Sequence, residues 1–156
     1  GTFIHNRVMA TKFSTEGLYL NKKNITLMVC IEKEREEEIL NYIRQSCTER
    51  TAKPGVPCAE LYRDALAMAG QEGLEDCFMG TRFQAKFVGH GVGLEINELP
   101  VLTTRSKDIL QPGMTFAFEP KFVLAGIGAV GIENTFLVTD SGVEKMTLLD
   151  ENITEL

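Results

Sequence analysis

Two stretches in the last third of the chain alternate between apolar residues and small or polar residues. In residues 115–124 the phenylalanines fall on one face of a strand, and residues 129–139 alternate in the same way. The link between them, residues 125–128, reads Ala-Gly-Ile-Gly, which is typical of a turn. The pattern predicts an antiparallel hairpin centred on Gly126, with its apolar face packed under helices.

This hairpin would place two glutamates opposite each other. Glu119 and Glu133 are equally far from Gly126, and each falls on the face of small residues. Directly opposed residues have Cβ atoms about 4.5–5.5 Å apart, and like charges at this spacing destabilise the pair. A buried carboxylate also needs a positive partner, and Lys121 is the only Lys or Arg close to either glutamate in the sequence. We therefore predict a divalent cation shared between the two carboxylates.

A histidine in a glycine-rich stretch is the third candidate ligand. His90 lies in the sequence GHGVGLE at residues 89–95. Imidazole and carboxylate together suit Mn²⁺, Co²⁺ or Zn²⁺. On residue chemistry alone, other interpretations stay open. A histidine beside glycines is often a turn or core residue, a single strand glutamate is often a surface residue, and the glycines could mark a bulge or bend.

The remaining pattern predicts further strands and two helices. The strands are Val8–Phe13, Ile25–Ile31 and Arg82–Val88, and the helices span 33–53 and 59–70. A turn at His90 and a loop with Pro100 and Pro112 would lead into the two glutamate strands. Helices followed by antiparallel strands indicate an α+β fold with the helices on one face of the sheet.

Composition narrows the class of protein. The chain has 156 residues, which suits one domain with a substantial core. Its net charge is −6, whereas a protein that binds nucleic acid usually carries a basic surface, so this class is not expected. No apolar run approaches the roughly 20 residues of a membrane helix, and no signal peptide is visible. The 4 cysteines show no C-x-x-C spacing, so we expect reduced thiols and a cytoplasmic location.

The chain from about Pro54 to Thr147 resembles the C-terminal half of the pita-bread metallopeptidases. That family includes methionine aminopeptidases, aminopeptidase P, prolidase (Xaa-Pro dipeptidase) and creatinase. The sequence GLEINELP at 93–100 resembles the bacterial Xaa-Pro peptidases more than the methionine aminopeptidases. The matching pieces are KPGV at 53–56, GHGVGLE at 89–95, NELP at 97–100, LQPGM at 110–114, FEP at 118–120 and GIENT at 131–135. The resemblance implies a curved antiparallel sheet, with residues 1–156 as a single truncated pita-bread-like domain.

The resemblance also implies roles for individual residues. His90, Glu119 and Glu133 would be three of the family's five ligands to a pair of Mn, Co or Zn ions. Glu119 would also carry the catalytic proton, and His90 would fix the metal that binds the substrate. Asn97 stands where prolidases usually have a substrate-contacting His, and Gly131 where many have an Arg. Specificity for proline is therefore not implied.

The family's two remaining ligands are aspartates that precede the long helix. No Asp occurs in this sequence before Asp64. The second aspartate position aligns with Asn24, or alternatively with Asn21, and the first falls near Lys12 or Phe13. An amide is a weak ligand and a phenyl ring is none. We therefore expect a divalent metal to be weakly held or absent, and hydrolysis to be weak or absent.

Three hypotheses remain. The chain is a fragment or divergent member of an Xaa-Pro-type peptidase with little activity, a non-catalytic domain that binds peptides or protein partners, or a hydrolase completed by a second chain. The resemblance covers one half of a fold with two similar halves. We therefore expect the face bearing Glu119 to be uncovered, together with Leu94, Ile96 and Leu99. A homo-oligomer, detectable by light scattering, would bury this surface. Nucleic acid and membrane are not expected as partners.

Overall fold

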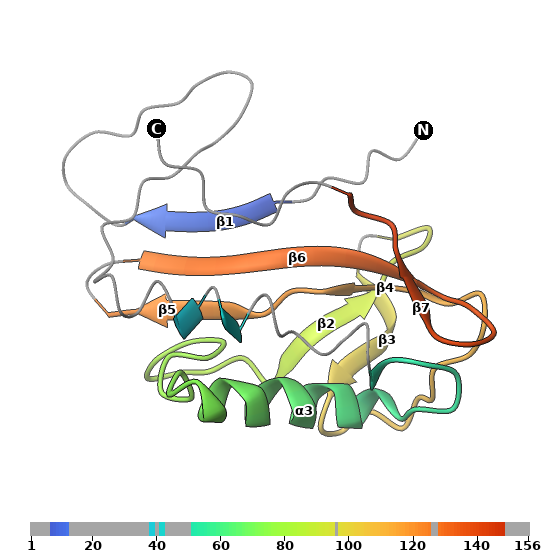
Figure 1. Ribbon diagram of the computed structural model, residues 1–156, viewed down its shortest axis with the longest axis horizontal. Helices are drawn as coiled ribbons and strands as arrows, with labels where there is room; N and C mark the ends of the chain where they lie inside the picture. The colour runs from blue at the N-terminus through green and yellow to red at the C-terminus, as the bar shows by residue number, and fades with distance from the viewer. Residues whose placement is uncertain are drawn as a thin grey trace, which may run out of the picture.

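The computed structural model describes residues 7–12, 38–39, 41–42, 51–95, 97–125 and 128–148, with the side chains described from residue 38 onward. Within these ranges, seven strands form one curled antiparallel sheet (Figure 1). They are β1 (Arg7–Lys12), β2 (Phe87–Gly91), β3 (Glu98–Thr103), β4 (Thr115–Phe118), β5 (Lys121–Leu124), β6 (Gly128–Val138) and β7 (Val143–Lys145). The strand order is β1-β6-β4-β2-β3, and β5 and β7 also pair with β6. The predicted α+β class is confirmed.

The predicted hairpin is confirmed in direction and register. β4 and β5 both pair antiparallel with β6, and every pair is centred on residue 126. Phe118 pairs with Asn134, and Lys121 pairs with Gly131. Between these two pairs, Glu119 and Pro120 interrupt the strand predicted for 115–124. The shared register therefore leaves Glu119 at the level of Glu133.

Aromatic side chains on the apolar face of the hairpin form much of the core. The Tyr42 ring meets the Phe122 ring edge-on at 4.8 Å between centroids, and Phe78 lies 5.7 Å from Phe122. The Tyr42 hydroxyl donates a hydrogen bond to the Ala65 carbonyl at 3.2 Å. These contacts join the helical residues near position 40 to the sheet and to the long helix.

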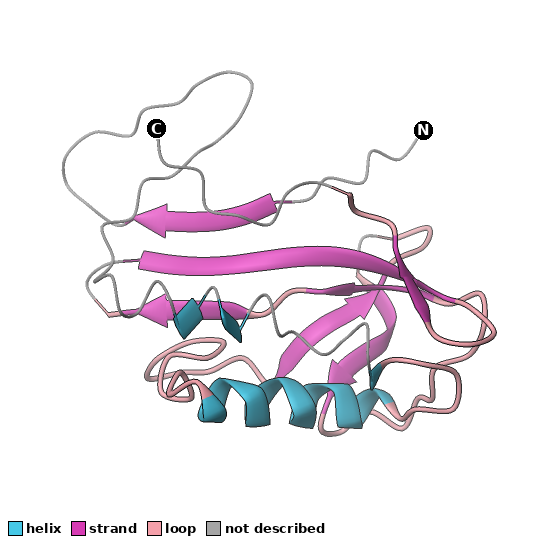
Figure 2. Cartoon of the chain, viewed as in Figure 1, coloured by secondary structure: helices cyan, strands magenta, loops and turns pink. Residues whose placement is uncertain are grey.

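The long helix, α3 (Cys58–Gln71), agrees with the prediction of 59–70. It lies alongside β2 and β3 (Figure 2) and buries one stripe of residues: Cys58, Ala59, Leu61, Tyr62, Ala65 and Ala69. Residues 38–39, 41–42 and 51 are also helical, within the helix predicted for 33–53. Residues 52 and 53 are not helical, so the predicted end of that helix is two residues too late. The other residues of that helix and the strand predicted for Ile25–Ile31 lie outside the described residues. No helix in the described ranges is long and apolar enough to cross a membrane.

The turn predicted at His90 is wrong, because His90 belongs to a strand inside the sheet. β2 pairs with β3 on one side and with β4 on the other, with a register shift around His90. The flanking glycines permit this close pairing. A Cβ at Gly89 would lie 2.1 Å from the Ala117 carbonyl oxygen, and one at Gly91 would lie 2.2 Å from the Leu99 carbonyl oxygen.

Two other expectations need correction, and one strand was not predicted. The strand predicted from Arg82 begins only at Phe87, because the preceding residues form a loop in which the Ala85 amide donates to the Met79 carbonyl at 2.8 Å. Pro100 lies in β3 and not in a loop, which a sheet tolerates because β3 is an edge strand. The short strand β7 had no clear sequence signal.

Burial affects the thiol at the start of α3. Cys58 is buried, and its amide donates to the Asp108 carbonyl at 2.9 Å. Burial, with a smaller contribution from the Asp108 carboxylate, raises the pKa of the Cys58 thiol to about 11 from its ordinary 9.0. The folded chain therefore holds a proton at this thiol that the unfolded chain loses at lower pH.

A glycine substitution tests the close pairing of β2 and β4. Gly89→Ala places a methyl group against a backbone carbonyl that cannot move independently of the sheet. We expect it to lower the free energy of unfolding by about 1–3 kcal/mol, measured by urea denaturation. Gly142→Ala is the matched control, because a Cβ there meets nothing within 4 Å and its change should stay within about 0.5 kcal/mol. Equal stability of the two variants would contradict the close approach.

The shifted thiol predicts a pH dependence of stability. Between pH 9 and about 11 the Cys58 thiol ionises in the unfolded chain but not in the folded one, so its contribution to stability is complete below pH 9 and is lost as pH rises. Urea denaturation of the natural chain and of Cys58→Ala across this range should show the natural chain losing more stability. Parallel curves would show that the folded thiol ionises normally.

Candidate functional site

His90 and Glu119 come together from neighbouring strands. His90 lies in β2, and Glu119 directly follows β4, where its amide donates to the Val88 carbonyl at 2.8 Å. His90 Nε2 lies 3.7 Å from Glu119 Oε1. Each residue is only 8% exposed. These two residues are therefore neighbours in a largely buried position, and their roles as metal ligands and catalytic groups stay predictions.

The ring of His90 is oriented by its own strand. Its Nδ1 lies 3.0 Å from the Gly91 carbonyl oxygen, which can only accept a hydrogen bond, so we assign the hydrogen to Nδ1. In the neutral ring, the lone pair of Nε2 then faces Glu119. This is the arrangement of a histidine that ligates through Nε2 and is held in place through Nδ1.

Glu119 already has a positive partner, Lys121. The Lys121 ammonium lies 2.5 Å from Glu119 Oε2. Only Pro120 separates the two residues, and Lys121 begins β5 directly after the interruption, so the lysine side chain is within reach of this carboxylate. The Lys121 side chain is 39% exposed, whereas that of Glu119 is 11% exposed. The need for a cation that led to the metal prediction is therefore met at Glu119 by a side chain of the same strand pair.

Glu133 is level with Glu119 in the register but is less buried. Its other neighbour across the sheet is the backbone of Arg7 in β1. Among the described residues, no three His, Cys, Asp or Glu side chains are grouped so that they could hold a metal ion. The ligand set of His90, Glu119 and Glu133 stays a prediction. As arranged here, one imidazole and one carboxylate paired with an ammonium do not fit a tightly held divalent ion.

The face bearing Glu119 is covered, contrary to expectation. Ala117 and Thr135 are buried on this face, and Glu119 itself is only 8% exposed. The surface that was expected to be open is therefore largely removed from solvent at these residues. The expected exposure of Leu94 and Leu99 is confirmed, and Ile96 lies outside the described residues.

Asn97, the candidate substrate contact, is exposed next to the start of β3. The loop before it is closed by Glu98, whose Oε2 accepts a hydrogen bond from the Glu95 amide at 3.3 Å. No described contact joins Asn97 to the pair of His90 and Glu119. Its role in substrate binding is untested and stays a prediction.

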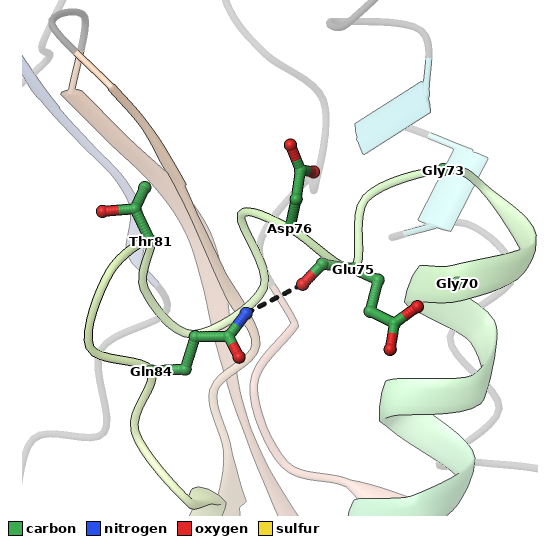
Figure 3. Close-up of a pocket in the computed structure, with 6 residues that line it drawn as sticks. All are labelled: Gly70, Gly73, Glu75, Asp76, Thr81 and Gln84. Carbon is green, nitrogen blue, oxygen red and sulfur yellow. Dashed lines mark hydrogen bonds between the residues drawn. The ribbon is translucent and has the colours of Figure 1, made fainter.

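A separate cavity of about 570 Å³ lies beside the end of α3 (Figure 3). Its lining residues are Gly70, Gly73, Glu75, Asp76, Thr81 and Gln84, and none of them is a predicted site residue. Gln84 Nε2 donates to the Glu75 carbonyl at 2.8 Å across this cavity. The candidate site and this cavity are therefore built from different residues.

Comparison with known proteins places the chain in a family. Residues 19–140 match metallopeptidase family M24, and the chain belongs to this family. It is 31% identical over 130 residues to an Xaa-Pro dipeptidase of Pyrococcus furiosus, a match covering 82% of this chain and 36% of the relative. The chain thus spans about a third of that relative's length.

Solved structures agree with this assignment. A prolidase structure from Pyrococcus furiosus has a TM-score of 0.66 and 33% identity, with 78% of this chain and 34% of that chain covered. An Xaa-Pro dipeptidase from Bacillus anthracis has a TM-score of 0.67 and 29% identity, with 81% and 35% covered. The curled sheet with its helix is therefore part of a pita-bread fold, as the sequence resemblance implied.

Proposed function

We propose that this chain is an M24 domain of the Xaa-Pro dipeptidase type that hydrolyses peptides weakly or not at all by itself. The observation that carries the proposal is the contact of His90 Nε2 with Glu119 Oε1 at 3.7 Å, on the strands where the family resemblance places two ligands. The similarity to Xaa-Pro dipeptidases supports a peptide as the substrate or ligand.

The proposed loss of activity rests on charge. Two neighbouring divalent ions repel each other, so a dinuclear site needs several carboxylates. The positions that align with the two aspartate ligands hold Asn24 and Lys12 or Phe13, none of which supplies a negative charge. A metal ion in such a site would act as a Lewis acid and supply a water nucleophile. This chain's own residues would orient an ion through His90 and move a proton at Glu119.

The ion pair of Lys121 and Glu119 favours the second hypothesis, a domain that binds peptides or proteins without catalysis. A lysine can neutralise the buried carboxylate without any metal, so the fold would persist after catalysis was lost. Binding of an uncleaved Xaa-Pro peptide, followed by calorimetry, tests this alternative. The third hypothesis, a site completed by a second chain, requires activity that rises with oligomer formation.

An activity assay tests the proposed function. We expect no measurable release of proline from Xaa-Pro dipeptides, with or without added Mn²⁺ or Co²⁺, because the charge for a second ion is missing. Asn24→Asp should raise metal affinity more than activity, since the other aspartate position is still unfilled.

Glu119→Gln serves as the control for contaminating peptidases. It removes the carboxylate assigned to proton transfer and keeps nearly the same shape. Turnover that requires metal and disappears in this variant would refute the inactive assignment and revive the hypothesis of an assembled enzyme.

A further inference from the structure

We propose that Lys121 is the built-in cation of the candidate site and that its ammonium occupies the position of a divalent ion on Glu119. The inference deepens the proposed function and rests on it for the identity of the site. It makes a separate statement, however, because it concerns which cation the buried carboxylate binds and not whether a peptide is cleaved.

The backbone of Lys121 is held from both sides, so its side chain starts from a fixed point in the sheet. On one side, Lys121 pairs with Gly131 of β6. On the other side, the Met79 amide donates to the Lys121 carbonyl at 2.6 Å. The Glu119 backbone is likewise fixed by its hydrogen bond to the Val88 carbonyl at 2.8 Å. Both partners of the ion pair therefore start from rigid positions in the sheet.

The residue opposite Lys121 makes room for its side chain. A Cβ at Gly131 would lie 2.7 Å from Lys121 Cγ, so a larger residue there would displace the lysine stem. With glycine at this position, the stem passes over β6 and the ammonium reaches Glu119. The pairing of Lys121 with a glycine on the neighbouring strand thus leaves the space that the lysine needs to reach Glu119.

The two oxygens of Glu119 have different partners. Oε1 faces His90 Nε2 at 3.7 Å, and Oε2 holds the Lys121 ammonium at 2.5 Å. A divalent ion on Oε2 would have to displace the ammonium, and one on Oε1 would stand close to an ammonium of like charge. At such short range, two like charges repel each other. The lysine therefore opposes metal binding at either oxygen.

Titration with Co²⁺ tests the proposal, with binding followed by calorimetry and by the visible absorption of the bound ion. Lys121→Met removes the charge and keeps the apolar stem, so it should bind Co²⁺ roughly 10- to 100-fold more tightly than the natural chain, the range typical of residues that tune metal ligands. Lys121→Arg keeps the positive charge and should show no gain. The double variant Glu119→Gln with Lys121→Met should lose the gain, because the freed ligand is gone.

Several outcomes would overturn the proposal. Equal affinity of the natural chain and Lys121→Met, including no binding by either, would show that the lysine does not exclude the ion. A gain that survives Glu119→Gln would place the ion elsewhere. Circular dichroism checks that each variant folds, and Lys121→Gln replaces Lys121→Met if the latter does not. Proline release is measured separately, so metal-dependent hydrolysis would refute the proposed function, whereas equal affinities would refute only this inference.

Discussion

Four strands take their positions from β6. β1 and β5 pair with its first half, and β4 and β7 pair with its second half. Because β4 and β5 share a single register on β6, the two residues between them, Glu119 and Pro120, are held at a defined level of the sheet. β2 then pairs with β4 and brings His90 to the same place. The site is therefore a consequence of strand register, with α3 packed alongside β2 and β3.

A carboxylate fixed in this way must be neutralised. Glu119 is largely removed from water, and burial of an unpaired charge costs several kcal/mol, on the order of the whole stability of a domain. Family M24 suggests a metal ion as the positive partner, but Lys121 stands 2.5 Å away in this chain. Burial of the pair does not show that it stabilises the fold more than an apolar pair would. The structure does pair this carboxylate with the Lys121 ammonium.

Sequence reasoning predicted those parts of the fold that depend on a repeating pattern. The alternation of residues 115–124 and 129–139 predicted the strands and their antiparallel pairing, and the equal spacing about residue 126 predicted the register. α3 was predicted from its helical spacing. The strand containing His90 was missed because its glycines suggest a turn, whereas in the structure they permit close contact with the neighbouring strands. Such contacts depend on which strands become neighbours, and a local pattern does not contain that information.

The candidate site was predicted in part. His90 and Glu119 meet as expected, while Glu133 is level with Glu119 but joins no three-residue metal group among the described side chains. Lys121 was noted in the sequence as a neighbour of Glu119. In the strand predicted for 115–124, the spacing of two residues was the signal that both side chains lie on one side of the sheet. What the sequence could not give was the space above Gly131 that lets the lysine reach the carboxylate.

A double-mutant cycle on Glu119 and Lys121 measures their interaction directly. Glu119→Gln, Lys121→Met and the combined variant are compared with the natural chain by urea denaturation in buffer containing a metal chelator. If the lysine is the cation of this carboxylate, the two single changes should be non-additive by about 0.5–3 kcal/mol, because Lys121→Met leaves a buried charge that the combined variant removes. Additive effects, within about 0.3 kcal/mol, would show that Glu119 does not depend on Lys121 and would contradict this account.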